Sequence, residues 1–218
     1  MATYAFLSYQ TADKKAAGRL KGVLTRAGVK TFLAHEDITV SEEWRLKILE
    51  EIAKADIFIC LLSESYMNSA WCVQESGIAA FRPGIAIIPL SLDSTTPKGF
   101  ISHVQSVRVG ADEISLDTLM PAFVKYDFPL AVKILTDQLA RAGTFRFAEA
   151  KFEEVMPLIP RMSNSQVVAL LEGAAANGQV HHATLCAREY IPPILKSHGR
   201  LLKRETRAFL KQVCAQYA

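Results

Sequence analysis

The sequence predicts an α/β domain with a parallel sheet, followed by an all-α segment. In the first half of the chain, short β-rich runs alternate with helical patterns, and no convincing strand follows Gly110. One run, residues 57–62, is continuously apolar, which is typical of a strand covered on both faces. The order strand, helix, strand favours parallel neighbours joined by a right-handed crossover.

The elements of the first domain are expected in a regular order. Residues 4–9 read as a strand, and residues 14–27 as a helix that ends at Gly28, because apolar side chains recur there at helical spacing. The remaining elements are a strand at 29–34, a helix at about 42–55 that Ser41 can cap, the strand at 57–62, a helix at 69–80, a strand at 85–90 and a shorter edge strand at 104–109. This order predicts a flavodoxin-like fold with a five-stranded parallel sheet.

A second domain, all-α, is expected at 136–218 after a first domain at 1–135. Helical patterns cover about 115–140, 145–157, 165–176, 182–196 and 201–216. Ser163 and Gln166 form a capping-box signal, and Pro192-Pro193 should bend or interrupt one helix. Short helices joined by short turns are typical of HEAT or armadillo pairs, but the repeat period is not clear enough to define an array.

The composition excludes several classes of protein. Half of the residues are apolar and 22% are charged, as in an ordinary globular protein, and the net charge of +3 is too small to indicate nucleic acid. No apolar run approaches the ~18 residues of a membrane span, and the N-terminus lacks the basic start of a signal peptide. We therefore expect a cytoplasmic protein that binds neither membrane nor nucleic acid.

The charge is unevenly distributed. Residues 141–218 carry 11 Lys and Arg against 6 Asp and Glu, which gives the second half a modest basic surface. The basic side of the helix at 201–216 reads as a solvated face, with a partner-docking surface as the alternative.

No metal site is expected. The four cysteines show no CxxC spacing, which leaves zinc and thioredoxin-like redox sites without support. The adjacent His181 and His182 would point to different sides of a helix, and no Cys, Asp or Glu accompanies them at ligand spacing.

The candidate site centres on the helix at 69–80. Trp71 and Glu75 are four residues apart and therefore share one helix face. An indole beside a carboxylate could hold a planar ligand and place a charge against it. In open α/β sheets, ligands bind outside the C-terminal ends of the strands. The residues that follow the first two strands, and so should lie near Glu75, include Ser8, Tyr9, Gln10 and His35.

Several motifs in residues 1–110 resemble those of Toll/interleukin-1 receptor (TIR) domains. They are Phe6-Leu7-Ser8-Tyr9, Thr31-Phe32-Leu33, Glu42-Glu43-Trp44, Leu62-Ser63, Ser65-Tyr66 and Trp71-Cys72-Val73-Gln74-Glu75. Singly they are weak, but their order and spacing make the resemblance specific. Some TIR domains are association modules, whereas many bacterial, plant and axonal ones cleave the nicotinamide–ribose bond of NAD+, and some cyclise the product.

The resemblance implies particular roles for this chain's residues. In the enzymatic branch, a glutamate four residues after a tryptophan is essential, and that pattern falls on Trp71 and Glu75. NAD+ would be the substrate, with no separate cofactor. The residues expected to contact the substrate are Phe6, Ser8, Tyr9, Gln10, His35, Trp44 and Trp71. Core roles for the two tryptophans and a solvated loop position for His35 remain open.

Two departures from the enzymatic pattern put cofactor affinity and product identity in doubt. Gln10 stands where many enzymatic relatives have an arginine, so any phosphate contact must come from elsewhere. Ala34 and His35 stand in place of a frequent aspartate.

The chemistry explains how a single carboxylate can suffice. The nicotinamide of NAD+ is a pyridinium and departs neutral, so the general acid of an ordinary glycosidase is not needed. The protein must position the ribose and stabilise the positive charge that grows at its anomeric carbon. Water, or an adenine folded back onto the ribose, can then capture that carbon.

The resemblance therefore predicts a TIR enzyme that hydrolyses or cyclises NAD+ and makes ADP-ribose or a cyclic or conjugated ADP-ribose signal, as in bacterial anti-phage defence. Self-association through the TIR domain is expected, with the acidic loop 35–42 as the candidate contact, and a downstream effector could respond to the product. A non-catalytic association module is the main alternative. Nucleotide 2-deoxyribosyl transfer is a third possibility, disfavoured by the Ser8-Tyr9 and Trp71–Glu75 patterns.

Overall fold

The computed structural model describes residues 3–33 and 43–217. The chain forms two compact units, Met1–Phe128 and Pro129–Ala218, so the division falls before the predicted boundary at 135. The predictions for Ala34, His35, the Ser41 cap and the acidic loop 35–42 lie outside the described residues.

The first unit contains the predicted five-stranded parallel sheet. Its strand order is β2-β1-β3-β4-β5, and every neighbouring pair is parallel, as in flavodoxin-like folds. The edge strand β5 is only two residues long. The strands are β1 (Tyr4–Ser8), β2 (Lys30–Leu33), β3 (Ile57–Leu62), β4 (Ala86–Ser91) and β5 (Val107–Arg108).

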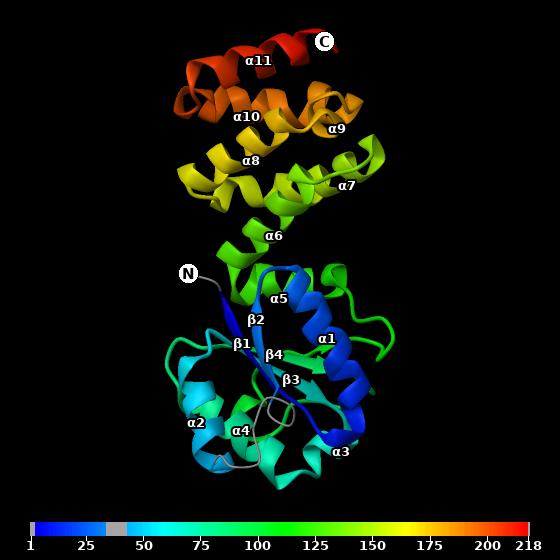
Figure 1. Cartoon of the computed structure of the whole chain (residues 1–218), viewed down its shortest axis with the longest axis vertical. Helices are drawn as coiled ribbons and strands as arrows, with labels where there is room; N and C mark the ends of the chain where they lie inside the picture. The colour runs from blue at the N-terminus through cyan, green and yellow to red at the C-terminus, as the bar shows by residue number, and fades with distance from the viewer. Residues whose placement is uncertain (1–2, 34–42, 218) are drawn as a thin grey trace. The chain divides into compact units, whose positions relative to one another are not determined.

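Helices cover both faces of this sheet (Figure 1). They are α1 (Lys14–Arg26), α2 (Trp44–Lys54), α3 (Glu64–Met67), α4 (Ala70–Phe81) and α5 (Leu116–Tyr126), with short 3₁₀ turns at η1 (Thr11–Asp13) and η2 (Gly99–Ile101). α1 ends where the sequence predicts: Gly28 adopts a φ of 78°, and Val29 N–H donates to the carbonyl of Leu24. This is the Schellman ending, which a glycine adopts without steric cost.

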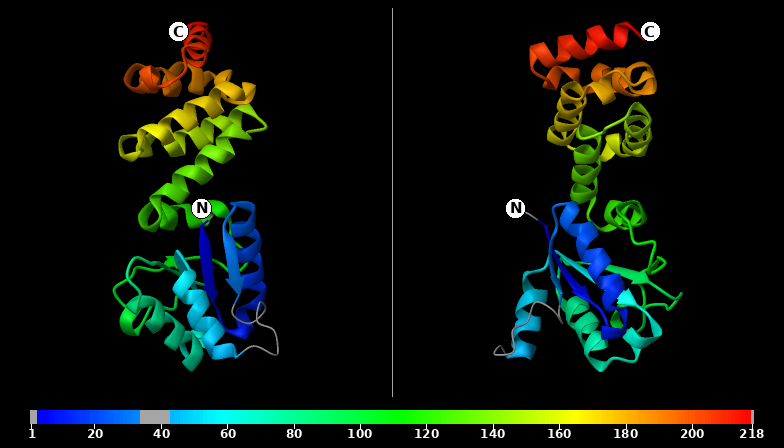
Figure 2. Two further views of the ribbon diagram at one scale, coloured as in Figure 1. Left: turned by 60° about the vertical axis from the view of Figure 1, so that its left-hand side comes forward. Right: turned by 45° about the vertical axis from the view of Figure 1, so that its right-hand side comes forward.

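One face of the sheet packs against α2 and α4, which lie side by side. α1 lies on the other side of the strands (Figure 2). All six residues of β3 are buried, as the apolar run predicts. Alternate residues of that strand, Phe58, Cys60 and Leu62, belong to one buried cluster with Phe6 of β1. The α2 and α4 residues of this cluster are Ile48, Ile52, Cys72 and Ala79.

The second unit consists of helices packed in a stack that follows the chain (Figure 1). Its elements are α6 (Phe128–Ala140), α7 (Phe145–Val155), η3 (Met156–Arg161), α8 (Asn164–Ala176), α9 (Gly178–His181), η4 (Cys186–Tyr190), α10 (Ile191–His198), η5 (Gly199–Leu201) and α11 (Arg204–Ala215). A HEAT-like repeat in this unit stays a prediction.

Local signals in this unit act as predicted. Ser163 and Gln166 form a capping box at the start of α8. Pro192 and Pro193 interrupt a helix: residues 186–190 widen into a π-helical turn, and α10 begins at Ile191 with both prolines in its first turn. A proline is tolerated there because the N–H groups of a first turn have no helical acceptor.

The helical pattern at 115–140 forms two helices, not one. α5 ends at Tyr126, Asp127 leaves the helical conformation with φ −142° and ψ 74°, and α6 begins at Phe128. Pro129 is in the first turn of α6, where its missing N–H costs no helical hydrogen bond, so it fits the start of a new helix. Within residues 3–33 and 43–217, no helix has the length and apolar character needed to cross a membrane.

Candidate functional site

Glu75 lies at the C-terminal edge of the sheet, inside the protein. Ser69 caps α4 by accepting a hydrogen bond from Cys72 N–H, and Glu75 follows in the middle of the helix. Its side chain is only 3% exposed. The β1 residue Ser8 reaches it from the point between β1 and β3 where the strand order reverses, the position at which this fold binds its ligands.

A chain of buried hydroxyl groups holds the carboxylate. Ser8 Oγ donates to Glu75 Oε2 over 2.5 Å, and Tyr66 Oη lies 2.8 Å from the same Ser8 oxygen. Tyr66 Oη also lies 2.7 Å from Ser76 Oγ and 3.1 Å from the carbonyl of Cys72. Residues from β1, α3 and α4 thereby fix the position of Glu75. Tyr66 and Ser76 were not predicted as site residues.

Burial changes the acidity of this site. Burial raises the pKa of Glu75 to about 7, although the hydrogen bond from Ser8 opposes the shift. The pKa of the Tyr66 hydroxyl is raised well above its usual value, again mainly by burial. A carboxyl group with its pKa near neutrality changes charge at the pH of a cell, which is common at functional sites.

Glu75 borders a cavity of about 230 Å³ between α2 and α4. Trp71 stands at this cavity, 45% exposed, with its ring edge-to-face against that of Trp44 at a centroid distance of 4.2 Å and an angle of 82°. The lining residues are Arg45, Ile48, Leu49, Trp71, Gln74, Glu75 and Ile78. An indole and a carboxylate thus border one hollow, as their shared helix face predicts.

Arg45 and Gln74 were not recognised from the sequence. Arg45 follows Trp44 directly, yet nothing in a single sequence says that this turn of α2 faces α4. The Arg45 guanidinium is largely exposed and lies 3.6 Å from Glu43, an exposed ion pair that holds it only weakly. It is a cation at the rim of the cavity.

Two residues predicted to contact the substrate, Phe6 and Tyr9, are buried in the structure. Phe6 is fully buried between the rings of Phe32 and Phe58, at centroid distances of 5.4 and 5.5 Å. Tyr9 is buried as well. Phe6 belongs to the hydrophobic core, and a substrate contact of either residue stays a prediction.

Three other predicted residues have different positions. Ser8 acts on Glu75 and does not line the cavity. The Gln10 side chain accepts from Ala12 N–H and caps η1, which occupies its carbonyl oxygen. His35 is outside the described residues.

A second polar cluster lies at the same C-terminal edge of the sheet and connects two of its loops. Ser63 Oγ and Ser65 Oγ lie 2.6 and 3.1 Å from one oxygen of Asp13 and donate to it. These bonds tie the loop after β1 to the start of α3, which carries Tyr66. In the part of the chain that the structure describes, no group of three or more His, Cys, Asp or Glu residues could hold a metal ion.

The fold and this site define a flavodoxin-like domain with a buried acid at the switch point of its sheet. The sequence profile of the TIR domain matches residues 5–120, more than half of the chain. The chain therefore belongs to the TIR domain family.

Among solved structures, the crystal structure of the TIR domain of the Toll-related receptor TRR-2 from the lower metazoan Hydra magnipapillata is similar. It shares 20% sequence identity with a TM-score of 0.46, over 58% of this chain and 96% of the receptor domain. A search of curated proteins gives no match.

Proposed function

We propose that this TIR domain cleaves the nicotinamide–ribose bond of NAD+ and that Glu75 is its catalytic residue. The observation that supports this most is the placement of Glu75: a buried carboxylate, fixed by Ser8, that borders a cavity shared with Trp71. In the proposed reaction, the bond between the anomeric carbon and the pyridinium nitrogen breaks, and its electron pair leaves with neutral nicotinamide. Water or an internal nucleophile then bonds to the anomeric carbon.

The surroundings of Glu75 suit stabilisation of a positive charge. Few water molecules can screen a carboxylate in a buried site, so its attraction for a developing oxocarbenium ion is stronger than in bulk water. Its hydrogen bond to Ser8 keeps the carboxylate oriented before the substrate arrives. Trp71 offers a ring on which nicotinamide or a folded-back adenine can stack.

The cavity admits only part of the substrate. Its volume of about 230 Å³ is below the ~300–1,000 Å³ of pockets that enclose a drug-sized ligand. We place the nicotinamide riboside end against Trp71 and Glu75, with the diphosphate outside. Arg45 at the rim then provides the phosphate contact that Gln10 does not supply.

Replacing Arg45 by Ala should raise KM for NAD+ about 10-fold or more with a smaller change in kcat. A hydrogen bond to a charged group contributes about 1.5–3 kcal/mol, and the diphosphate carries no reacting bond. Steady-state kinetics of nicotinamide release provide the measurement. As the matched control, Glu43→Gln frees Arg45 from its ion pair and should leave KM unchanged or lower it. An unchanged KM in Arg45→Ala would remove Arg45 from the substrate site.

Self-association is part of this proposal, and α4 offers a surface for it. Phe81 and Phe100 are 89% and 80% exposed, unusual for such large rings. Phe100 of η2 lies over Gly77, and Phe81 follows Gly77 by one helical turn, so both rings are on the same side of α4. We propose that a second copy of the chain covers this aromatic patch.

The double replacement Phe81→Ser/Phe100→Ser should weaken self-association by at least tenfold, because it removes both exposed rings from the contact. Sedimentation velocity over a concentration series measures this, and activity per subunit should fall in parallel. Phe145→Ser, which removes a 49% exposed phenylalanine in the second unit, is the matched control. Equal association constants for the two variants would exclude the patch.

The alternative function is that of an association module without catalysis. The engagement of Gln10 in a turn favours it, because the Gln10 carbonyl oxygen is then not available to a substrate. Incubation of the pure, concentrated protein with NAD+, followed by mass spectrometry, separates the two functions. Release of nicotinamide supports the enzyme, and its product distinguishes hydrolysis from cyclisation. If no nicotinamide is released at any protein concentration, including in extract from phage-infected cells, the enzyme is excluded and the association module is the better proposal.

The biological role that we propose rests on the resemblance to bacterial enzymes and not on the site geometry. ADP-ribose, or a cyclic or conjugated derivative of it, would act as a signal in anti-phage defence. A downstream effector would respond to this product. The mass-spectrometric product of the same incubation decides which compound to test on candidate effectors.

A further inference from the structure

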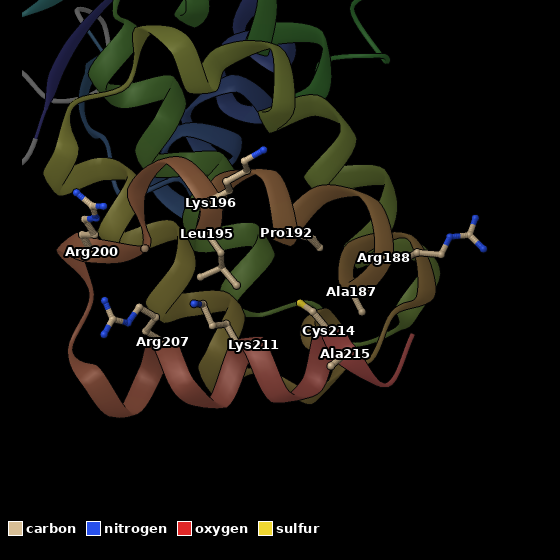
Figure 3. A pocket seen from close by; sticks show the side chains of 11 residues that line it. Ala187, Arg188, Pro192, Leu195, Lys196, Arg200, Arg207, Lys211, Cys214 and Ala215 are labelled. Atoms are coloured by element: carbon tan, nitrogen blue, oxygen red, sulfur yellow. The ribbon is translucent and has the colours of Figure 1, made fainter. Parts of the chain in front are cut away.

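The second unit contains a larger hollow than the one beside Glu75. It lies between α10 and α11, with a volume of about 640 Å³ (Figure 3). This is within the ~300–1,000 Å³ range of small-molecule clefts. We call it the α10–α11 groove. Its lining residues are Ala187, Arg188, Pro192, Leu195, Lys196, Gly199, Arg200, Arg207, Lys211, Cys214 and Ala215.

The charged residues that line the groove are all positively charged. Five of its eleven lining residues are Lys or Arg, and none of its described lining residues is Asp or Glu. Arg188 is paired with Glu189 at 2.7 Å and points away from the groove in Figure 3. Glu205, at the start of α11, borders a different hollow. The groove is therefore complementary to an anion.

Two arginines lie at one end of the groove. Arg200 of η5 and Arg207 of α11 come from different elements and lie on the same side of the view in Figure 3. Lys211 follows Arg207 by one helical turn and so shares its face of α11. Guanidinium groups from two elements can form paired hydrogen bonds to phosphate oxygens, which a point charge cannot.

Gly199 holds one of these arginines in place. A Cβ added to this buried glycine would lie 3.6 Å from Arg207 Cδ and 3.8 Å from Leu195 Cδ2. The Arg207 stem thus packs against the backbone of Gly199 and beside Leu195. This packing restricts the rotamers of Arg207 before a ligand binds, which lowers the entropic cost of binding.

The rest of the groove is apolar. Pro192 and Leu195 of α10 face Cys214 and Ala215 of α11 across it, with Ala187 at the adjoining turn. A ligand that fits must combine a strongly anionic group with a flat or apolar part. Nucleotides have this combination, since their phosphates suit arginines and their bases suit apolar walls.

We propose that the α10–α11 groove binds a free nucleotide, with its phosphates on Arg200, Arg207 and Lys211 and its base against Pro192. An extended acidic peptide fits less well, because Arg188, the lining cation at the other end, points away from the groove. This site is separate from the one bordered by Glu75, and the inference does not depend on NAD+ cleavage.

Isothermal titration calorimetry on the full chain tests this site. ADP should bind, and both adenosine and inorganic diphosphate should bind at least tenfold more weakly. Arg200→Gln/Arg207→Gln should lower ADP affinity at least 30-fold, with Arg200→Gln/Lys211→Gln as a second pair if the first does not fold. Arg204→Gln, on α11 but outside the groove lining, is the matched control and should bind like the wild type.

Several outcomes would overturn the proposal. They are no binding of ADP at millimolar concentration, equal affinities in the control and the double variants, and diphosphate binding as tightly as ADP. Tighter binding of a short single-stranded RNA than of ADP would assign the groove to nucleic acid instead.

Discussion

Replacing Glu75 by Gln should reduce nicotinamide release by at least about 10²–10³-fold, the range observed when one preorganised stabilising group is removed from an active site. Glutamine has nearly the same shape, and its carbonyl oxygen can still accept the hydrogen bond from Ser8. The change therefore removes the negative charge and little else. Mass spectrometry of nicotinamide, with saturating NAD+, provides kcat for both proteins.

The control for this variant is Glu64→Gln, the same chemical change at an exposed acid at the start of α3. It should release nicotinamide at the wild-type rate. If Glu75→Gln stays within threefold of the wild type in kcat, the carboxylate is not catalytic, and the association module becomes the better proposal. If both variants lose activity, acidic charge on this unit matters more generally than the proposal allows.

The wild-type rate should also depend on pH. Because burial raises the pKa of Glu75 to about 7 and the carboxylate is the form that stabilises a cation, activity should rise as the pH increases through 7. The protonated form below this pH cannot supply the charge. The pH profile of the wild type and the Glu75→Gln variant therefore both test whether activity needs the negative charge of Glu75.

Much of the first unit follows from the sequence, and β3 shows why. Six consecutive apolar residues bounded by Asp56 and Ser63 allow a strand covered on both faces, and the structure buries all six. The division of the 115–140 pattern does not follow from the sequence, because apolar periodicity continues through the break and the pattern holds two prolines, of which Pro121 lies inside α5 and Pro129 lies at the start of α6. Periodicity reports which side of an element is buried, not whether its backbone is continuous.

The site was only partly predictable. Helical spacing places Trp71 and Glu75 on one face, but the depth of Glu75 depends on Ser8 and Tyr66, which meet it only in the folded chain. Alternation along β1 directs Phe6 to the same face of the sheet as Ser8 but farther from its edge, where Phe32 and Phe58 enclose it. The shared motif does not show that Phe6 is enclosed in the core whereas Ser8 reaches the edge of the sheet.

The α10–α11 groove could not be inferred from the sequence. Its basic residues on the last helix already stand out there, but they read as a solvated face. What changes this interpretation is the packing of the Arg207 stem against Gly199, which places an arginine beside a hollow. Such a contact joins two elements, so the hydrophobic periodicity of either element alone cannot predict it.

The free energy of unfolding of the first unit should fall as the pH rises, because of Glu75. Its pKa is about 7 in the folded protein against 4.5 as the ordinary value, so the folded state holds the proton more tightly. The stabilisation is present below pH 4.5 and is lost as the pH rises to about 7. The shift corresponds to about 3 kcal/mol in total, or about 2–3 kcal/mol between pH 5 and pH 8.

Glu75→Gln removes this titration, so the difference in unfolding free energy between the wild type and the variant isolates Glu75. Urea unfolding followed by tryptophan fluorescence suits the measurement, since the chain's only tryptophans, Trp44 and Trp71, both lie in the unit that holds Glu75. Above pH 7 the variant should be the more stable protein. Parallel pH curves for the two proteins would contradict the raised pKa.

The predictions for stability and for activity both depend on the proton of the Glu75 carboxyl group. As the pH rises through 7, Glu75 acquires the charge that the proposed reaction needs, and the folded unit loses the stability that the neutral acid gave it. An acid retained in the interior at a cost in stability is expected where function requires it. If Glu75→Gln is more stable than the wild type at pH 8 and is also inactive, a loss of folding cannot explain the loss of activity, and the missing charge of Glu75 is its cause.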